Sequence, residues 1–195
     1  MALLYSIKAA LHGVSPMVWR RLRVHGSTSL ADLHYILQTC FGWHDDYQHR
    51  FHIHGQDYGI WRDGGLAFCT DAFQVTLRDF AFDAGDRFYY EFNFFANWRV
   101  DIRIEAVAEI SPRQKAPFCL SGHGMPGVIT VDAHWAELKL VQWILAHRHT
   151  RTKASVQRRV EKLDAVRFNR HKANRVLAAP DLQARFCGET MIVMN

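Results

Sequence analysis

The sequence predicts an α+β fold: a mixed, mostly antiparallel twisted sheet carries one helix from the N-terminal half, and a helical, basic third follows it. Three observations predict this. Short runs of alternating apolar residues recur before residue 110, Pro and Gly gather in residues 111–130, and apolar residues then recur at helical spacing. We therefore divide the chain into an α+β domain over 1–130 and a basic helical extension over 131–195, packed on that domain.

The first predicted elements are two strands and a helix. Residues 4–12 and 16–24 predict strands joined by a turn, because Pro16 can begin a strand without donating a ladder hydrogen bond. Residues 29–40 predict a helix, since leucines return to one face and Ser29 can cap it with an acidic residue three positions later.

Alternation and helical spacing then define the remaining elements. Further strands are predicted at 48–53, 58–61, 87–95 and 100–105. After the long loop, residues 136–147 and 156–166 each place apolar side chains on one helical face.

Composition excludes several classes of protein. A chain of 195 residues with 49% hydrophobic and 22% charged side chains can bury one core, which excludes a disordered protein. No apolar run reaches about 18 residues, and the first residues lack the pattern of a signal peptide, so we expect no membrane partner. The four cysteines are far apart in the sequence, which predicts free thiols and a cytoplasmic location.

Several short patterns follow one another in a fixed order: Pro-x-x-Trp-Arg-Arg, Leu-His-x-x-x-Gln, Gly-Trp, His-x-Phe, an aromatic strand with Trp, and Pro-x-Cys. Their positions are Pro16, Trp19, Arg20, Arg21, His34, Gln38, Gly42, Trp43, His49, Phe51, Asn93, Trp98, Glu105 and Cys119. Together they resemble the plasmid pRiA4b ORF-3-like family, seen on plasmids and near insertion elements. The resemblance covers about residues 3–126 and implies a compact α+β domain with no assigned reaction.

The chain departs from this family at polar positions. Members resembling it usually carry Tyr-Asp-Phe-Gly-Asp-x-Trp-x-His before the last long strand. Here the two carboxylates become Asn93 and Ala96, the histidine becomes Val100, and Tyr47 replaces one histidine of His-Leu-His-x-Phe. Ala and Val cannot bind a metal or move a proton. The departure therefore favours a non-catalytic member with no cofactor and no bound metal.

A catalytic alternative uses the polar residues that are left. His34, His49 and Asp45 carry the residue types of a metal-dependent hydrolase or recombinase, provided that the fold brings them together. The competing interpretation makes His34 a half-buried side chain bonded to a neighbouring strand and His49 a satisfied core histidine. The second interpretation is the one we favour.

The strongest functional feature is a cationic segment. Residues 139–175 hold eleven Lys and Arg side chains against Glu161 and Asp164, a net charge of +9. A docked helix with one apolar stripe would hold such cations toward the phosphates of DNA or RNA. The candidate binding residues are Arg148, Arg151, Lys153, Arg158, Arg159, Lys162, Arg170 and Lys172.

A different class of function uses aromatic side chains. Phe92, Phe94, Phe95 and Trp98 predict an apolar sheet face that a protein partner or a second copy of the chain would cover. In that case the basic helices are an ordinary solvated surface.

Overall fold

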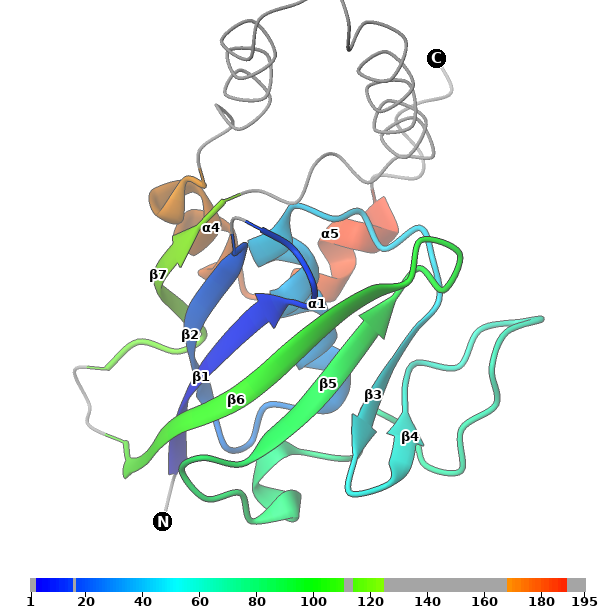
Figure 1. Ribbon diagram of the computed structural model, residues 1–195, viewed down its shortest axis with the longest axis horizontal. Helices are drawn as coiled ribbons and strands as arrows, with labels where there is room; N and C mark the ends of the chain where they lie inside the picture. The colour runs from blue at the N-terminus through cyan, green and yellow to red at the C-terminus, as the bar shows by residue number, and fades with distance from the viewer. Residues whose placement is uncertain (1–2, 16, 111–113, 125–167, 189–195) are drawn as a thin grey trace, which may run out of the picture.

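The computed structural model describes residues 3–15, 17–110, 114–124 and 168–188. The described chain forms a seven-stranded sheet in the order β4-β3-β5-β6-β1-β2-β7, and each neighbouring pair is antiparallel (Figure 1). The strands are β1 (Leu3–Leu11), β2 (Trp19–His25), β3 (His49–Ile53), β4 (Gln56–Tyr58), β5 (Arg87–Phe92), β6 (Trp98–Glu109) and β7 (Phe118–His123). The helices are α1 (Leu30–Phe41), the short η1 (Leu77–Phe80), α4 (Arg170–Leu177) and α5 (Leu182–Gly188). This architecture confirms the predicted α+β class.

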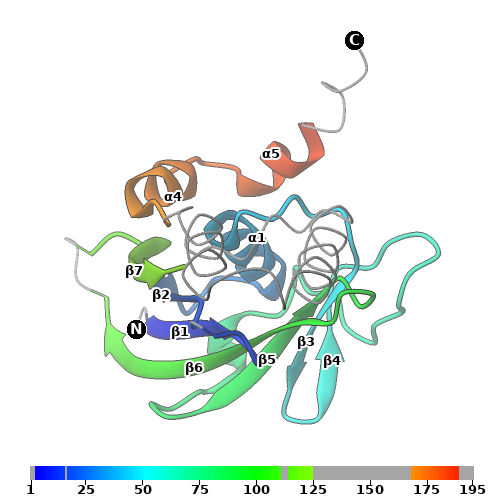
Figure 2. The same cartoon turned by 45° about the horizontal axis from the view of Figure 1, so that its top comes forward.

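Helix α1 is the predicted helix of the N-terminal half. The Ser29 hydroxyl accepts a hydrogen bond from the backbone N–H of Asp32 at 3.0 Å, and the Asp32 carboxylate reaches back to the Ser29 backbone in a capping box. Gly42 ends the helix in the left-handed conformation, with φ of 74°. Figure 2 shows α1 lying between the sheet and the two C-terminal helices α4 and α5.

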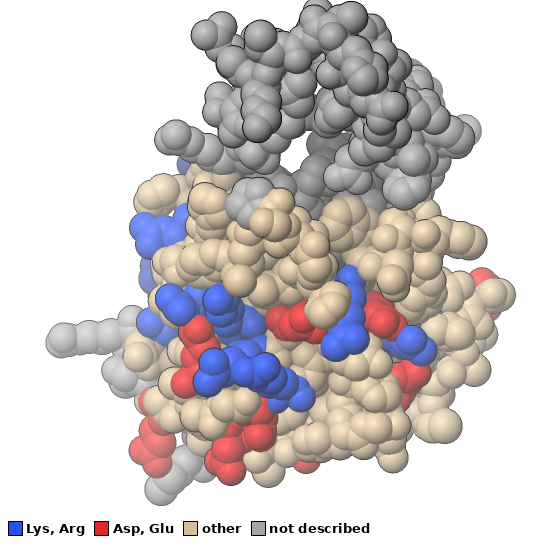
Figure 3. Space-filling view, viewed as in Figure 1, with Lys and Arg blue, Asp and Glu red and all other residues tan. Residues whose placement is uncertain are grey.

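The two faces of the sheet differ because side chains alternate along each strand. On the inner face Ile7, Leu22, Phe51 and Tyr90 are fully buried in the core that α1 covers. The outer face carries charged and aromatic side chains, and Figure 3 shows basic and acidic groups gathered over it. The alternation of each strand therefore separates a core from a solvent-facing surface.

Strand β7 lies inside the stretch that the sequence predicts as a loop, and there the prediction is wrong. It pairs antiparallel with β2 at one edge of the sheet. A Cβ added to Gly122 of this strand would lie 2.7 Å from the Phe168 ring and 2.9 Å from the Cδ atom of Arg20. Gly122 therefore permits close packing within a strand, whereas its sequence context suggested a turn.

Other differences are smaller. Strand β4 begins at Gln56, two residues before the predicted hairpin partner, because its turn is tighter than expected. The helices predicted at 136–147 and 156–166, like Pro16, lie outside the described residues. The division of the chain at residue 130 stays a prediction.

The C-terminal helices pack on the α+β body. Helix α4 contacts β7 and α1, and α5 contacts α1. Asn174 of α4 bonds to the open edge of β7: its Oδ1 accepts from the Cys119 N–H at 2.7 Å, and its Nδ2 donates to the Cys119 carbonyl at 2.9 Å. Within the described residues, no helix is long and apolar enough to cross a membrane.

Candidate functional site

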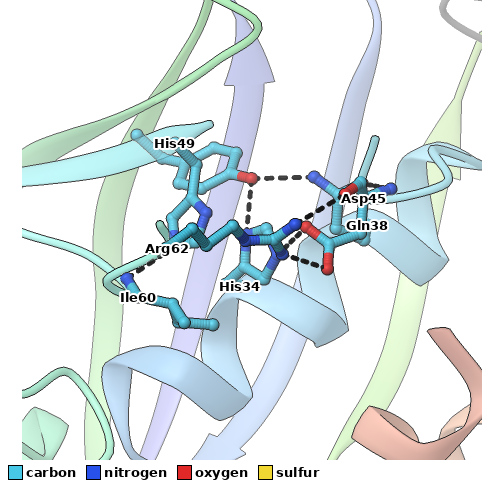
Figure 4. A network of polar contacts seen from close by, with 7 residues as sticks. His34, Gln38, Asp45, His49, Ile60 and Arg62 are labelled. Carbon is cyan, nitrogen blue, oxygen red and sulfur yellow. Dashed lines mark hydrogen bonds and ion pairs between the residues drawn. The ribbon is translucent and has the colours of Figure 1, made fainter. Parts of the chain in front are cut away.

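A buried polar network lies between α1 and the inner face of strands β3 and β5 (Figure 4). Its centre is His34 of α1, which is fully buried and bonded at both ring nitrogens. Nδ1 lies 2.8 Å from the Tyr90 hydroxyl, and Nε2 lies 2.8 Å from a carboxylate oxygen of Asp45. Gln38, one helical turn after His34, donates to the same Tyr90 hydroxyl at 2.8 Å and accepts from the backbone N–H of Asp45 at 2.9 Å.

Asp45 connects this network to the surface. Its side chain is 8% exposed, and one oxygen bonds His34 while the other forms an ion pair with Arg62, which is 38% exposed. Burial raises the pKa of Asp45, but the hydrogen bonds and charges of His34 and Arg62 outweigh it and hold that pKa below its usual value. Asp45 is therefore an ionised carboxylate at neutral pH.

His49 of β3 stacks on His34, with ring centroids 3.6 Å apart and planes 17° from parallel. Burial, then the charges of His34 and Arg62, lowers the pKa of His49 well below its usual value. Burial likewise lowers the pKa of His34, although Asp45 opposes this. The Ile60 N–H donates to Nε2 of His49 at 3.4 Å, so the neutral ring carries its proton on Nδ1, which has no partner among the described residues.

The structure thus brings together the three residues of the catalytic alternative. Ligand atoms of His34, Asp45 and His49 lie within 4.8 Å of one another. Their orientation does not suit one ion, because the lone pairs of two stacked rings lie in parallel planes and do not converge on a point about 2 Å from each nitrogen. Both ring nitrogens of His34 already have hydrogen-bond partners, and the Asp45 carboxylate is already paired with the positive charge of Arg62. This geometry supports a hydrogen-bonded network and not a metal centre.

Sequence reasoning missed two members of this network and the burial of a third. Tyr90 and Arg62 were not candidates, and His34 was expected to be half-buried but is fully enclosed. A tyrosine among the aromatic residues of β5 was the available signal, because a buried phenol needs a hydrogen-bond partner. The interior therefore keeps a polar network although several polar positions of the family motif are replaced.

The positions at which the chain departs from its family lie beside this network without joining it. Val100 is buried in the core, and Asn93, the residue after β5, is in the left-handed region with φ of 54°. The Asn93 side chain accepts from the backbone N–H of Ala96 at 3.2 Å, which stabilises the turn into β6. In this chain, the part of the family motif that differs from other members forms a turn.

The remaining motif residues have structural partners. Arg20 is fully buried; its guanidinium donates to the Cys40 carbonyl at 2.7 Å and to the His123 carbonyl at 2.9 Å, and it stacks over Phe168. Burial lowers the pKa of Arg20 to about 10, so it stays charged at neutral pH. Trp43, Phe51, Phe92 and Cys119 are core residues, whereas Arg21 pairs with Glu105 on the outer face.

The residues of the predicted aromatic docking face are divided between the core and the surface, and docking of a partner stays a prediction. Phe88, Tyr90 and Phe92 point into the core, where α1 covers them. Strand β5 ends at Phe92, so Phe94 and Phe95 lie in the following turn and are exposed. The inner sheet face is thus filled by the protein itself and is closed to a partner.

The candidate nucleic-acid residues fall mostly outside the described residues. Arg148, Arg151, Lys153, Arg158, Arg159 and Lys162 do so, while Arg170 and Lys172 lie in the first turn of α4. Asn169 caps α4 by accepting from the Lys172 N–H at 2.9 Å.

Comparison with known proteins identifies relatives without an assigned activity. An uncharacterized protein, y4hQ, of Sinorhizobium fredii (strain NBRC 101917 / NGR234) is 32% identical over 104 residues, which make up 51% of this chain and 52% of that protein. The chain thus spans about half the length of that curated relative. The crystal structure of a protein of unknown function, MM3350 from Methanosarcina mazei Go1, has a TM-score of 0.65 at 21% identity and covers 89% of this chain and 97% of its own. The family model described as plasmid pRiA4b ORF-3-like protein matches residues 4–172.

Proposed function

We propose that this chain, which belongs to the plasmid pRiA4b ORF-3-like family, is an accessory protein that binds nucleic acid through its basic segment 139–175. The segment carries a net charge of +9, and a helix within it is docked on the folded body. An excess of positive charge on one segment attracts polyanions over a distance set by the salt concentration.

The observation that carries this proposal is the orientation of α4. Ala173 and Leu177 are buried against the body, whereas Lys172 and Arg175 are exposed. The apolar stripe thus holds the helix in place and leaves its cations toward solvent. No salt bridge engages Lys172 or Arg175 among the described residues, so both charges are available to phosphates.

Phosphate contacts of this kind give affinity that depends on salt and not on base sequence. Each phosphate neutralised by Lys or Arg releases condensed counterions, and the logarithm of the binding constant falls with the logarithm of salt concentration. The expected slope is about −0.9 for each contact with a duplex and about −0.7 for each contact with a single strand.

The test measures binding of labelled duplex and single-stranded oligonucleotides to the full chain across a salt series. Two charge-reversal variants are compared with wild type: Lys172→Glu with Arg175→Glu in α4, and Arg158→Glu, Arg159→Glu with Lys162→Glu in the preceding stretch. A matched control, Arg78→Glu with Lys115→Glu, makes the same change in net charge as the α4 variant at exposed sites outside the basic segment.

We expect at least a tenfold loss of affinity and a shallower salt slope in both basic-segment variants, and little change in the control. Circular dichroism checks that each variant stays folded. Affinity that does not respond to salt or to either variant contradicts the proposal, as does binding to phosphatidylserine vesicles or to an acidic protein in the absence of oligonucleotide binding.

A further inference from the structure

Four cations stand side by side across the outer face of the sheet. The antiparallel registers pair Arg87 with Arg103, Arg103 with Lys8, and Lys8 with Arg21. These residues belong to the adjacent strands β5, β6, β1 and β2, and we call them the cation row. With strands about 4.8 Å apart, the cation row spans about 14 Å. Figure 3 looks onto this face, where blue side chains gather over β6, β1 and β2.

This alignment is unfavourable for the protein alone. Like charges directly opposite one another on neighbouring strands destabilise a sheet. Among the described residues a single carboxylate, Glu105, bonds to the cation row, and it is bound by both Nε and the terminal nitrogen of Arg21. Lys8, Arg87 and Arg103 have no salt bridge with a described carboxylate. An anionic ligand would relieve this repulsion.

Aromatic rings flank the cation row on the same face. Trp19, two residues from Arg21, is half-buried, and the charged groups of Lys8 and Arg21 lie 5.4 and 5.5 Å from the centroid of its ring. Tyr89, two residues from Arg87, is also on this face, but its ring already contacts the Arg99 guanidinium at 4.1 Å and the stacked ring of His52, so Trp19 is the ring that a base can reach. Cations beside flat rings on an open sheet are the elements with which proteins hold unpaired bases and their phosphates.

We propose that the outer sheet face binds single-stranded nucleic acid, with phosphates along the cation row and a base stacked on Trp19. A duplex keeps its bases stacked on one another, so it can meet the cations but not the rings. This surface is a second binding site and goes beyond the proposed function. It is distinct from α4, which lies against β7 and the inner side of the sheet.

The test uses the full chain with a labelled single strand of mixed sequence and its matched duplex. The row variant is Arg87→Glu with Arg103→Glu, and the ring variant is Trp19→Leu. The control is again Arg78→Glu with Lys115→Glu, which makes the same charge change away from the row. A neutral form, Arg87→Gln with Arg103→Gln, should melt at or above the wild-type temperature because it removes like-charge pairs.

We expect the row variant to lose at least tenfold in single-strand affinity and to lower the magnitude of the salt slope by about 1.4, the value for two phosphate contacts. The ring variant should lose about tenfold on the single strand and little on the duplex. The control should stay within twofold of wild type.

Three other results would overturn this inference, the proposed function or both. Row and ring variants that bind the single strand like wild type overturn this inference; if the α4 variant still loses affinity, the proposed function stands alone. Wild-type protein that binds neither oligonucleotide overturns both. Equal losses on duplex and single strand in the ring variant overturn the assignment to single strands.

Discussion

The two faces of the sheet differ in how their charged groups are paired. On the inner face, nearly every polar atom near His34 has a partner, and the carboxylate of Asp45 lies between a histidine and Arg62. On the outer face, four cations are lined up across neighbouring strands with one carboxylate between them. Buried polar groups must be paired because water is absent, whereas exposed charges are screened and can be kept for a ligand. The difference separates groups that stabilise the fold from groups that are available for binding.

Among the changes that test this difference between the two faces, Asp45→Ala should have the largest effect on stability. The change leaves Nε2 of His34 without its acceptor and removes the ion pair of Arg62, and it places an alanine at φ of 59°, where Asp and Asn are better tolerated. We expect a loss of about 3 kcal/mol in unfolding free energy. Urea unfolding measures it, with Asp45→Asn as the matched variant that should lose less; equal stability of wild type and Asp45→Ala would show that the inner network is not stabilising.

The second-largest effect on stability should come from lowering the pH. Burial lowers the pKa of both His34 and His49 in the folded protein, so the unfolded chain binds more protons once the pH falls below about 6.5. Stability is therefore full at neutral pH and decreases as pH decreases, by about 2 kcal/mol between pH 7 and 5. Asp45, whose folded pKa is also lowered, adds to the loss at more acid pH.

The variant His49→Phe keeps a ring stacked on His34 but cannot be protonated. Its unfolding free energy should depend less steeply on pH than that of wild type, which chemical unfolding at several pH values will measure. An unchanged pH dependence would show that His49 does not contribute to the loss of stability in acid.

Tyr90→Phe tests the other end of the network. It removes only an oxygen, but Nδ1 of His34 and Nε2 of Gln38 then lose the partner they share. Unpartnered buried polar atoms cost about 1.5 kcal/mol in unfolding free energy. The phenol of Tyr58, which is not fully buried and donates to Gln56 alone among the described residues, provides the matched control: Tyr58→Phe should change stability much less.

The smallest effects should come from the outer face, and there their signs matter. Arg103→Gln removes like-charge neighbours and should stabilise the protein by about 0.5 kcal/mol while weakening single-strand binding. Glu105→Gln removes the carboxylate that pairs with Arg21 and should destabilise the protein by a similar amount while strengthening binding. Thermal melting and oligonucleotide titration of the two variants should therefore shift in opposite directions.

Local patterns in the sequence predicted most of the fold. The capping residues of α1 and the alternation of β1, β2, β3, β5 and β6 are short-range signals, and they predicted these elements; some ends differ, since the strand predicted over 87–95 ends at Phe92 and the one predicted over 16–24 begins at Trp19. Strand β7 was missed because Pro and Gly around it resemble a loop, although Gly122 is there to admit Phe168 and Arg20.

The site was harder to predict because it depends on which strands become neighbours. His34, Asp45 and His49 were identified as candidates, but Tyr90 and Arg62 come from distant parts of the sequence that only the tertiary fold brings to them. The cation row depends on three strand registers at once, and alternation within a single strand does not contain that information.

The amide of Asn174 has a consequence for the behaviour of the whole molecule. With one acceptor and one donor it imitates the peptide unit of an eighth strand and occupies hydrogen-bonding groups of Cys119 that another chain would otherwise find. A copy of the protein whose C-terminal helices are released would present β7 as a template for self-association. Helix α4 thus also covers part of the edge of β7, where another chain could otherwise pair with the sheet.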